Sequence, residues 1–230
     1  MLRAFSVLFV LPLLALAAPV PKERPNERML REFGTVVDPD KDTSFALDGS
    51  KLKISVPAGE HNFVPGKGLA NAPRITRSVE GDFVALVRIR MYDGPVADGG
   101  GRLLAQAGMF VGSDEQNFAF HARSLEVQQG GLRRNGRHGG WINGNANGGG
   151  SSGGGHFDPE AVYFRIKRIG NKLLFAAVPD ANAGNWHEFG GPTVNLPEKV
   201  TFGLFVTNST KQAFTVEFDE LSITSTPAAK

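Results

Sequence analysis

Closely spaced carboxylates near the C-terminal end are the most obvious candidates for catalysis: Glu217, Asp219 and Glu220. Hydrolysis of a glycosidic bond with retention of configuration needs two carboxyl groups about 5–5.5 Å apart. In a strand, Glu217 and Asp219 would share one face, but the next position on that face is Leu221, and Glu220 would point away. We therefore expect a solvated acidic edge that resists strand pairing, with glycoside hydrolysis as the less favoured alternative.

The other nucleophiles and bases are poorly placed for catalysis. Ser151 and Ser152 lie in a run of glycines, which is not expected to hold a nucleophile within the tolerance that catalysis requires. The five histidines are scattered, so a zinc site would have to assemble across loops. The absence of cysteine excludes thiolate chemistry and disulfides. We expect a protein that is not an enzyme.

Alternating acids at Asp38, Asp40 and Asp42 could converge on a cation. The helix–loop–helix calcium motif would need glycine at the position of Thr43 and glutamate at that of Gly49, and it has neither. We expect a turn in which Asp38 and Asp42 accept hydrogen bonds from backbone groups, and no cofactor. The less favoured alternative is an irregular structural calcium site formed by Asp38, Asp40 and Asp42.

Basic, amide and aromatic side chains gather on the polar faces of several expected strands. Sugar binding uses aromatic rings against apolar sugar faces and planar polar groups against hydroxyl pairs. If these strands share a sheet, they form a ligand surface that suits an anionic polysaccharide or glycan; the alternative is an ordinary solvated face. The candidate ligand-binding residues are Arg88, Arg90, Asn117, His121, Arg123, Tyr163, Arg165 and Trp186.

The elements that must position these residues show a period of two, which is typical of half-buried strands. Alternation is clearest at 52–56, 83–91, 118–123, 162–167 and 200–206. Gly170-Asn171 predicts a tight hairpin between two such runs. The alternation of the last strand breaks after Phe218, which predicts a β-bulge near Asp219-Glu220. Many short strands separated by turn residues predict an all-β sandwich or barrel.

The segment 130–155 differs from the rest, because it holds twelve glycines in 26 residues. Glycine has a high backbone entropy cost and no side chain to bury. We therefore expect a long loop here, serving either as a disordered insert or as a binding lid. Trp141 lies within it.

The N-terminal residues predict export. Arg3 precedes an apolar run that ends at Ala15-Leu16-Ala17, which is typical of a signal peptide covering residues 1–18. Residues 19–32 are polar and proline-containing, so we expect a flexible linker followed by one domain at 33–226. The mature protein is then expected to be secreted, extracellular or periplasmic, without a membrane span. A net charge of +2 gives little reason to expect nucleic-acid binding.

Several segments resemble a known family. They are Phe33–Asp40, Asn71–Arg74, Val79–Phe83, Ala107–Val111, Asp114–Phe118 and Phe164–Arg168. Their order and spacing are similar to secreted bacterial domains with a concanavalin A-like fold, catalogued as domain of unknown function 1349. The resemblance implies a two-sheet antiparallel jelly-roll sandwich. We expect a non-catalytic carbohydrate-binding or accessory module, with a structural or protein-interaction module at the cell surface as the alternative.

Overall fold

Fourteen strands, one α-helix and one 3₁₀ helix (Ala181–Ala183) make up the computed structural model, which describes residues 25–63, 71–91, 103–114, 116–128, 131–142, 145–156 and 160–225. The strands form two antiparallel sheets of seven. Sheet A has the order β1 (Thr35–Val37), β4 (Arg74–Glu80), β13 (Lys199–Asn208), β6 (Leu103–Asp114), β7 (Asn117–Gln128), β8 (Gly131–Ile142), β9 (Asn145–His156). Sheet B has the order β12 (His187–Gly190), β11 (Lys172–Val178), β10 (Ala161–Ile169), β5 (Phe83–Met91), β14 (Phe214–Ser225), β3 (Lys51–Val56), β2 (Ser44–Asp48).

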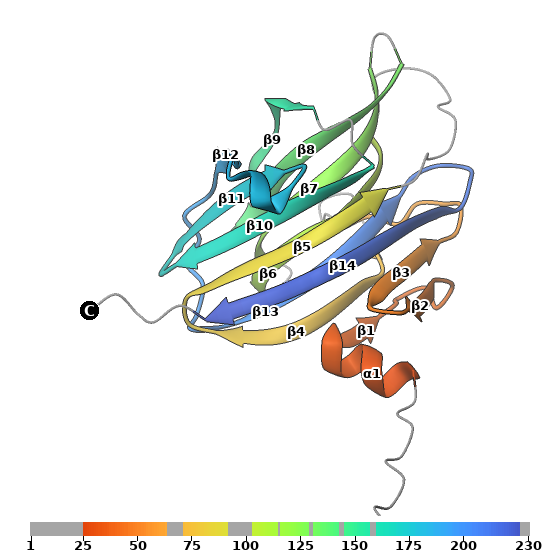
Figure 1. Cartoon of the computed structure of the whole chain (residues 1–230), viewed down its shortest axis with the longest axis horizontal. Coiled ribbons are helices and arrows are strands. Elements are labelled where there is room, and N and C mark those ends of the chain that lie inside the picture. The colour runs from red at the N-terminus through yellow and green to blue at the C-terminus, as the bar shows by residue number, and fades with distance from the viewer. Residues whose placement is uncertain are drawn as a thin grey trace, which may run out of the picture.

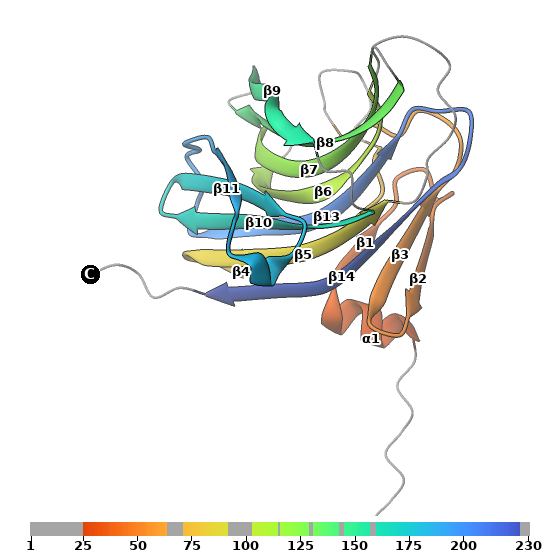
Figure 2. The same cartoon turned by 45° about the horizontal axis from the view of Figure 1, so that its top comes forward.

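The two sheets pack face to face and enclose the core between them. Figures 1 and 2 show β6, β7 and β13 in one layer and β5, β10 and β14 in the other. Along β5 every second residue is buried, from Phe83 to Met91, as the alternation predicts. Phe83 meets Phe202 of the opposite sheet edge to face, with ring centroids 6.4 Å apart. The expected all-β sandwich is thus confirmed.

Two local predictions are also confirmed. Residues Ile169 and Lys172 pair across the tight β10–β11 hairpin, and Gly170 has the positive φ of 55° that such a turn requires. In β14 the register shifts between Asp219 and Ser222, and Glu220 has a φ of 53°. This bulge turns the chain so that Leu221 and Ile223 pack against the core.

The prediction of a flexible linker at 19–32 is wrong for residues 25–32. Residues Pro25–Glu32 form the helix α1, which lies beside β1 (Figure 1). Its Met29 is 5% exposed, and Phe33 just beyond it is 4% exposed, so both belong to the core. Their burial stabilises a helix too short to persist alone. The expected signal peptide and residues 19–24 lie outside the described residues.

The prediction of a long loop at 130–155 is also wrong, because residues 131–142 and 145–156 form the strands β8 and β9. β8 pairs with β7 from Phe118↔Trp141 to Gln128↔Gly131. Strand pairing is made by backbone hydrogen bonds, so an already ordered neighbour can hold a glycine-rich strand that has little to bury. Glycine also permits close approach, since a Cβ on Gly140 would lie 2.5 Å from the Phe118 carbonyl oxygen.

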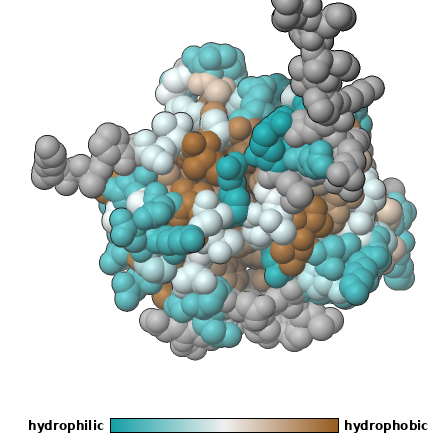
Figure 3. All heavy atoms as spheres, turned by 90° about the horizontal axis from the view of Figure 1, so that it is seen from below, coloured by the Kyte–Doolittle hydropathy of each residue, from teal (hydrophilic) through white to brown (hydrophobic). Residues whose placement is uncertain are grey.

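The surface is largely hydrophilic. Figure 3 shows hydrophobic atoms confined to a few patches on the face seen from below. Among the described residues, the exposed large hydrophobic side chains are Val36 and Ile169. No helix in the described ranges is long and apolar enough to cross a membrane.

Candidate ligand-binding pocket on the outer face of sheet A

A second aromatic cluster lies outside the core, on the face of sheet A that points away from sheet B. Its buried members belong to β6, β7 and β13, and two half-buried rings pack against them. In β6, Met109 and Val111 point into the core while Phe110 between them points outward. The outer cluster is Phe110, Phe118, Phe120 and Phe205, with Ala122, joined by Phe63 and Trp141.

Glycines on neighbouring strands make room for these rings. Phe110 lies directly opposite Gly203, and Phe205 lies opposite Gly108. A Cβ on Gly203 would come within 2.6 Å of the Phe110 Cζ atom, so the ring lies across the space that a side chain would fill. The pairing of aromatic residues with cross-strand glycines is a known way to cover exposed backbone in a sheet.

Phe63 covers the centre of the outer cluster. Its ring stacks on Phe205 with a centroid distance of 4.2 Å and an interplanar angle of 14°, and it meets Phe118 edge-on at 5.0 Å. The segment before it is held by two hydrogen bonds: Asn62 N donates to Asn71 Oδ1 at 2.9 Å, and Ala72 N donates to Asn62 O at 2.9 Å. Phe63 is therefore a fixed wall of the cluster.

Beside these rings the surface opens into a pocket of about 210 Å³. Its apolar lining comes from Val37, Phe63, Phe110 and Phe118, and its polar lining includes Arg74, Thr76, Asp114 and Thr201. Ligand sites in proteins typically combine such apolar walls with a few fixed polar groups.

Asp114 supplies a fixed negative charge at the pocket. Its carboxylate accepts hydrogen bonds from Ser113 Oγ at 2.8 Å, Gln116 N at 2.7 Å and Asn117 Nδ2 at 3.2 Å. The Ser113 hydroxyl, followed by Gln116 N and Asn117, lowers the pKa of Asp114 below its ordinary value. Asp114 is the single carboxylate among the described lining residues, so the pocket holds no carboxylate pair for glycoside hydrolysis.

The same face of sheet A continues into a buried polar group. Ser124 Oγ donates to Glu126 Oε1 at 2.6 Å, and Asn135 Nδ2 donates to Glu126 Oε2 at 3.3 Å. Arg137 lies 3.6 Å from the same carboxylate. The outer face of sheet A thus changes from aromatic to polar along its strands.

The candidate residues predicted from the sequence divide between the two sheets, because β7 lies in sheet A whereas β5 and β10 lie in sheet B. Asn117 is the one predicted residue that reaches the pocket, through its hydrogen bond to Asp114. The condition that these strands share a sheet is therefore not met.

His121 and Arg123 point into the space between the sheets and are 0% exposed. They lie on the inner face of β7, in step with the core residues Ala119 and Leu125. His121 stacks on Phe175 with centroids 5.3 Å apart, its Nε2 lies 3.1 Å from the Ala176 carbonyl oxygen, and burial lowers its pKa to about 3. Arg123 donates to the carbonyl oxygen of Glu160. Both side chains are structural.

Arg88, Arg90 and Tyr163 lie on the outer face of sheet B, where each meets an acid. Arg88 forms a bidentate pair with Asp219, at 2.7 and 2.5 Å, which raises the pKa of Arg88 above its ordinary value. Arg90 lies 3.4 Å from Glu160. The hydroxyl of Tyr163 donates to a carboxylate oxygen of Glu220 at 2.9 Å.

Arg165 and Trp186 complete this face. Arg165 pairs with Glu188 at 2.5 Å, and its guanidinium lies 4.4 Å from the centroid of the Trp186 ring. The acids that pair with these bases are distant in the sequence, so alternation alone gave no signal for them. With each of its predicted bases paired, the face offers little unmatched positive charge for an anionic glycan.

Glu217 and Asp219, the pair weighed for catalysis, lie on this same face. Glu217 is 3.3 Å from Lys53, 3.6 Å from Lys51 and 3.8 Å from Arg90. Asp219 is held by Arg88. Both carboxylates thus take part in ion pairs with cations of the neighbouring strands, as on a solvated face held together by cross-strand pairs.

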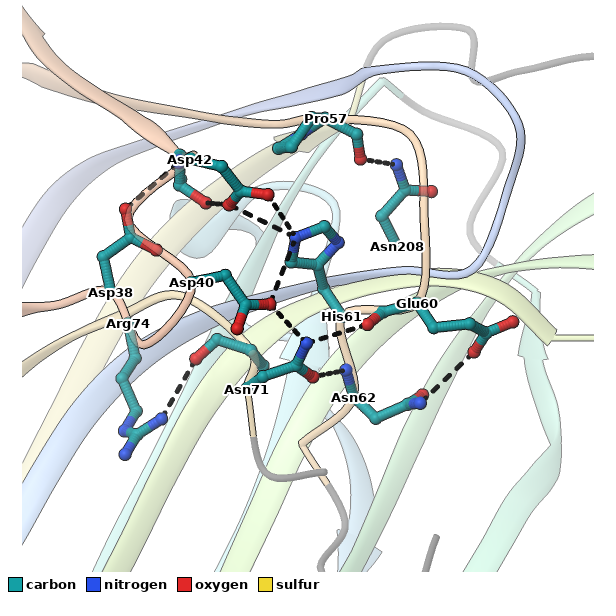
Figure 4. Close-up of polar contacts among 12 residues, drawn as sticks. Asp38, Asp40, Asp42, Pro57, Glu60, His61, Asn62, Asn71, Arg74 and Asn208 are labelled. Atoms are coloured by element: carbon teal, nitrogen blue, oxygen red, sulfur yellow. Dashed lines mark hydrogen bonds and ion pairs between the residues drawn. The ribbon is translucent and has the colours of Figure 1, made fainter. Parts of the chain in front are cut away.

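The three aspartates of the alternative calcium site separate in the structure. Asp38 Oδ2 accepts a hydrogen bond from Thr43 N at 3.0 Å, as in the expected turn. Asp40 and Asp42 instead converge with His61, and ligand atoms of these three residues lie within 4.8 Å of one another (Figure 4). The alternative calcium site did not include His61, which comes from a segment about twenty residues away.

No protein-family profile matches the chain, and no curated protein matches it in sequence. Solved structures match its fold. A functionally unknown protein from Saccharomyces cerevisiae has 15% identity and a TM-score of 0.62, over 84% of this chain and 96% of that one. The carbohydrate-binding module CBM66 from Bacillus subtilis has 13% identity and a TM-score of 0.50, over 80% and 92%.

A third similar structure is the GH43 protein BlXynB from Bacillus licheniformis, with 12% identity and a TM-score of 0.54 over 81% of this chain. The chain spans only 40% of that protein's length. Identities this low show a shared fold alone. The chain is therefore a two-sheet antiparallel jelly-roll sandwich, similar in fold to carbohydrate-binding modules and to parts of glycoside hydrolases.

Proposed function

We propose that the chain is a secreted, non-catalytic carbohydrate-binding or accessory module that holds a glycan in the pocket on the outer face of sheet A. The observation that carries the proposal is the outward-facing aromatic cluster of Phe63, Phe110 and Phe118 beside Arg74 and Asp114. Apolar walls with a few fixed polar groups, outside the core between the sheets, are typical of a ligand site.

The chemistry of the pocket suits a neutral sugar. Aromatic rings stack on the apolar face of a sugar ring, and the guanidinium and carboxylate bond its hydroxyl groups. Arg74 and Asp114 supply one charge of each sign, so the pocket does not favour an anionic ligand. A pocket of about 210 Å³ has room for a small part of a glycan chain.

Two further observations support the proposal without testing it. The fold is similar to that of CBM66, a carbohydrate-binding module from Bacillus subtilis. The residues at 1–18 predict export, and the resemblance to domain of unknown function 1349 implies the same compartment. Export would bring the pocket into contact with polysaccharides outside the cytoplasm.

The proposal is tested by glycan-array binding followed by isothermal titration with the glycans that bind. We expect Asp114→Ala and Phe63→Ala to weaken binding by about tenfold or more, since about 1.4 kcal/mol corresponds to a factor of ten. The matched control is Arg165→Ala on the outer face of sheet B, which should bind as the wild type does. Absence of binding to any glycan, together with recovery of a protein partner, would favour the interaction-module alternative.

A further inference from the structure

A group of metal-ligating side chains lies beside the pocket. His61 Nε2 is 3.3 Å from Asp42 Oδ2 and 3.8 Å from Asp40 Oδ2. The His61 side chain is 4% exposed, whereas the Asp40 and Asp42 side chains are 41% and 44% exposed. The group thus has a buried base, His61, and two carboxylates that solvent and an ion can reach.

The spacing of these atoms fits ligands of a common metal ion better than hydrogen-bonded partners. A charge-assisted hydrogen bond between imidazole and carboxylate is about 2.7–2.9 Å long. Donor atoms about 2.1 Å from a tetrahedral metal ion are about 3.4 Å from one another. The observed separations of 3.3 and 3.8 Å lie near the second value.

His61 supplies an independent indication. Its ring is buried and its Nε2 points at the gap between the two carboxylates (Figure 4). Among the described residues, His61 Nδ1 has no hydrogen-bond partner, and the partners of Nε2 are the carboxylates of the group itself. The contacts of Nε2 at 3.3 and 3.8 Å are longer than good hydrogen bonds, so a metal ion bound at Nε2 would satisfy this buried nitrogen, while Nδ1 would stay without a partner in the described part of the chain.

Asn71 orients the carboxylate of Asp40 through a hydrogen bond. Its Nδ2 donates to Asp40 Oδ2 at 2.5 Å and to the Glu60 carbonyl oxygen at 2.9 Å. Its Oδ1 accepts from Asn62 N at 2.9 Å. Outer hydrogen bonds of this kind orient metal ligands.

We propose that Asp40, Asp42 and His61 bind a divalent transition-metal ion of the Zn²⁺ class, with water completing the coordination. An imidazole ligand suits zinc and its neighbours, whereas Ca²⁺ takes oxygen ligands alone. His61 lies two residues before Phe63, and Asn71 contacts both Asp40 and the backbone of Asn62. Metal binding at this site stabilises the segment that places Phe63 over the outer aromatic cluster.

The test uses the tag-free mature chain after chelation and dialysis, titrated with ZnCl₂ and separately with CaCl₂ by calorimetry. We expect one Zn²⁺ ion per chain, weak or no Ca²⁺ binding, and a higher melting temperature with Zn²⁺. His61→Gln and Asp42→Asn should each abolish the binding or weaken it strongly. Asn71→Ala should weaken it by about 10- to 100-fold, as loss of an outer partner does.

His187→Gln is the matched control, because His187 is an exposed histidine outside the group. Far-UV circular dichroism without metal checks that each variant is folded. The proposal is overturned if the wild-type chain takes up no Zn²⁺ at millimolar concentration, or if His61→Gln and Asp42→Asn bind it as well as His187→Gln does. Preference for Ca²⁺, unaffected by His61→Gln, would also overturn it.

Discussion

The outer faces of the two sheets carry opposite kinds of side chain. On sheet A, aromatic rings cover the strands and border a pocket; on sheet B, ion pairs such as Arg88–Asp219 cross from strand to strand. Cross-strand ion pairs on a solvated face satisfy one another and need no ligand. Under the proposed function, the apolar rings outside the core mark the binding face, and the larger number of bases and acids on sheet B does not.

The largest effect is expected from Phe205→Ala. Phe205 is 0% exposed at the centre of the outer cluster, although it lies outside the core between the sheets. Removal of a buried phenylalanine side chain costs about 3–5 kcal/mol of the free energy of unfolding. Urea denaturation measures the loss, and a change below about 1 kcal/mol would show that the outer cluster does not pack as a second core.

The next largest effect is a pH dependence of the free energy of unfolding that arises from His121. This residue lies on the inner face of β7, the strand whose outer face carries Phe120. The folded-state pKa of about 3 lies below the ordinary value of 6.5, so folding favours the neutral ring. The associated stability is complete above pH 6.5 and is lost as the pH falls toward 3. At pH 5 the loss is about 2 kcal/mol.

The measurement compares the free energy of unfolding at pH 7 and pH 5 in the wild type and in His121→Leu. The wild type should lose about 2 kcal/mol more than the variant over this interval. Equal losses in the two proteins would mean that His121 is protonated in the folded state.

Arg88 and Asp219 should show a smaller coupling. Their side chains are 26% and 7% exposed, so solvent screens the pair in part. A double-mutant cycle with Arg88→Met and Asp219→Asn should give a coupling of about 1–2 kcal/mol, which decreases at high salt. The absence of a measurable coupling would mean that the ion pairs of sheet B do not contribute to the stability of the sheet.

The smallest effect is expected from Arg165→Ala. The variant loses a pair with Glu188, which is 56% exposed, and a contact with Trp186. Surface changes of this kind alter the free energy of unfolding by about 0.5 kcal/mol or less. A larger loss would show that the outer face of sheet B is more tightly coupled than its exposure indicates.

Much of the fold could be predicted from the sequence, because the alternation of β5 and the break after Phe218 are local patterns. β8 could not, since its glycines carry no periodicity and the strand depends on β7 for its hydrogen bonds. The sequence also could not predict which strands share a sheet, because β5 pairs with β14 from a distant part of the chain.

The candidate site was harder to predict than the fold. In β7 both faces are apolar near Phe118–Ala122, so alternation cannot tell which face points inward. For this reason the sequence pattern assigned His121 to the outer polar face, whereas it lies on the inner face. In β13, Phe202 and Phe205 lie on opposite faces, and this was a signal, since phenylalanines on both faces of a strand predict cover on both sides of the sheet. The cross-strand glycines such as Gly203 are recognised only once the register is known.

The most direct test of the account is one titration series with a glycan that the wild type binds, using Phe63→Ala and Arg165→Ala. The account predicts that Phe63→Ala weakens binding by about tenfold or more, which is about 1.4 kcal/mol, while Arg165→Ala leaves the dissociation constant unchanged. The opposite result, with binding lost in Arg165→Ala and kept in Phe63→Ala, would place the ligand on sheet B and contradict the account.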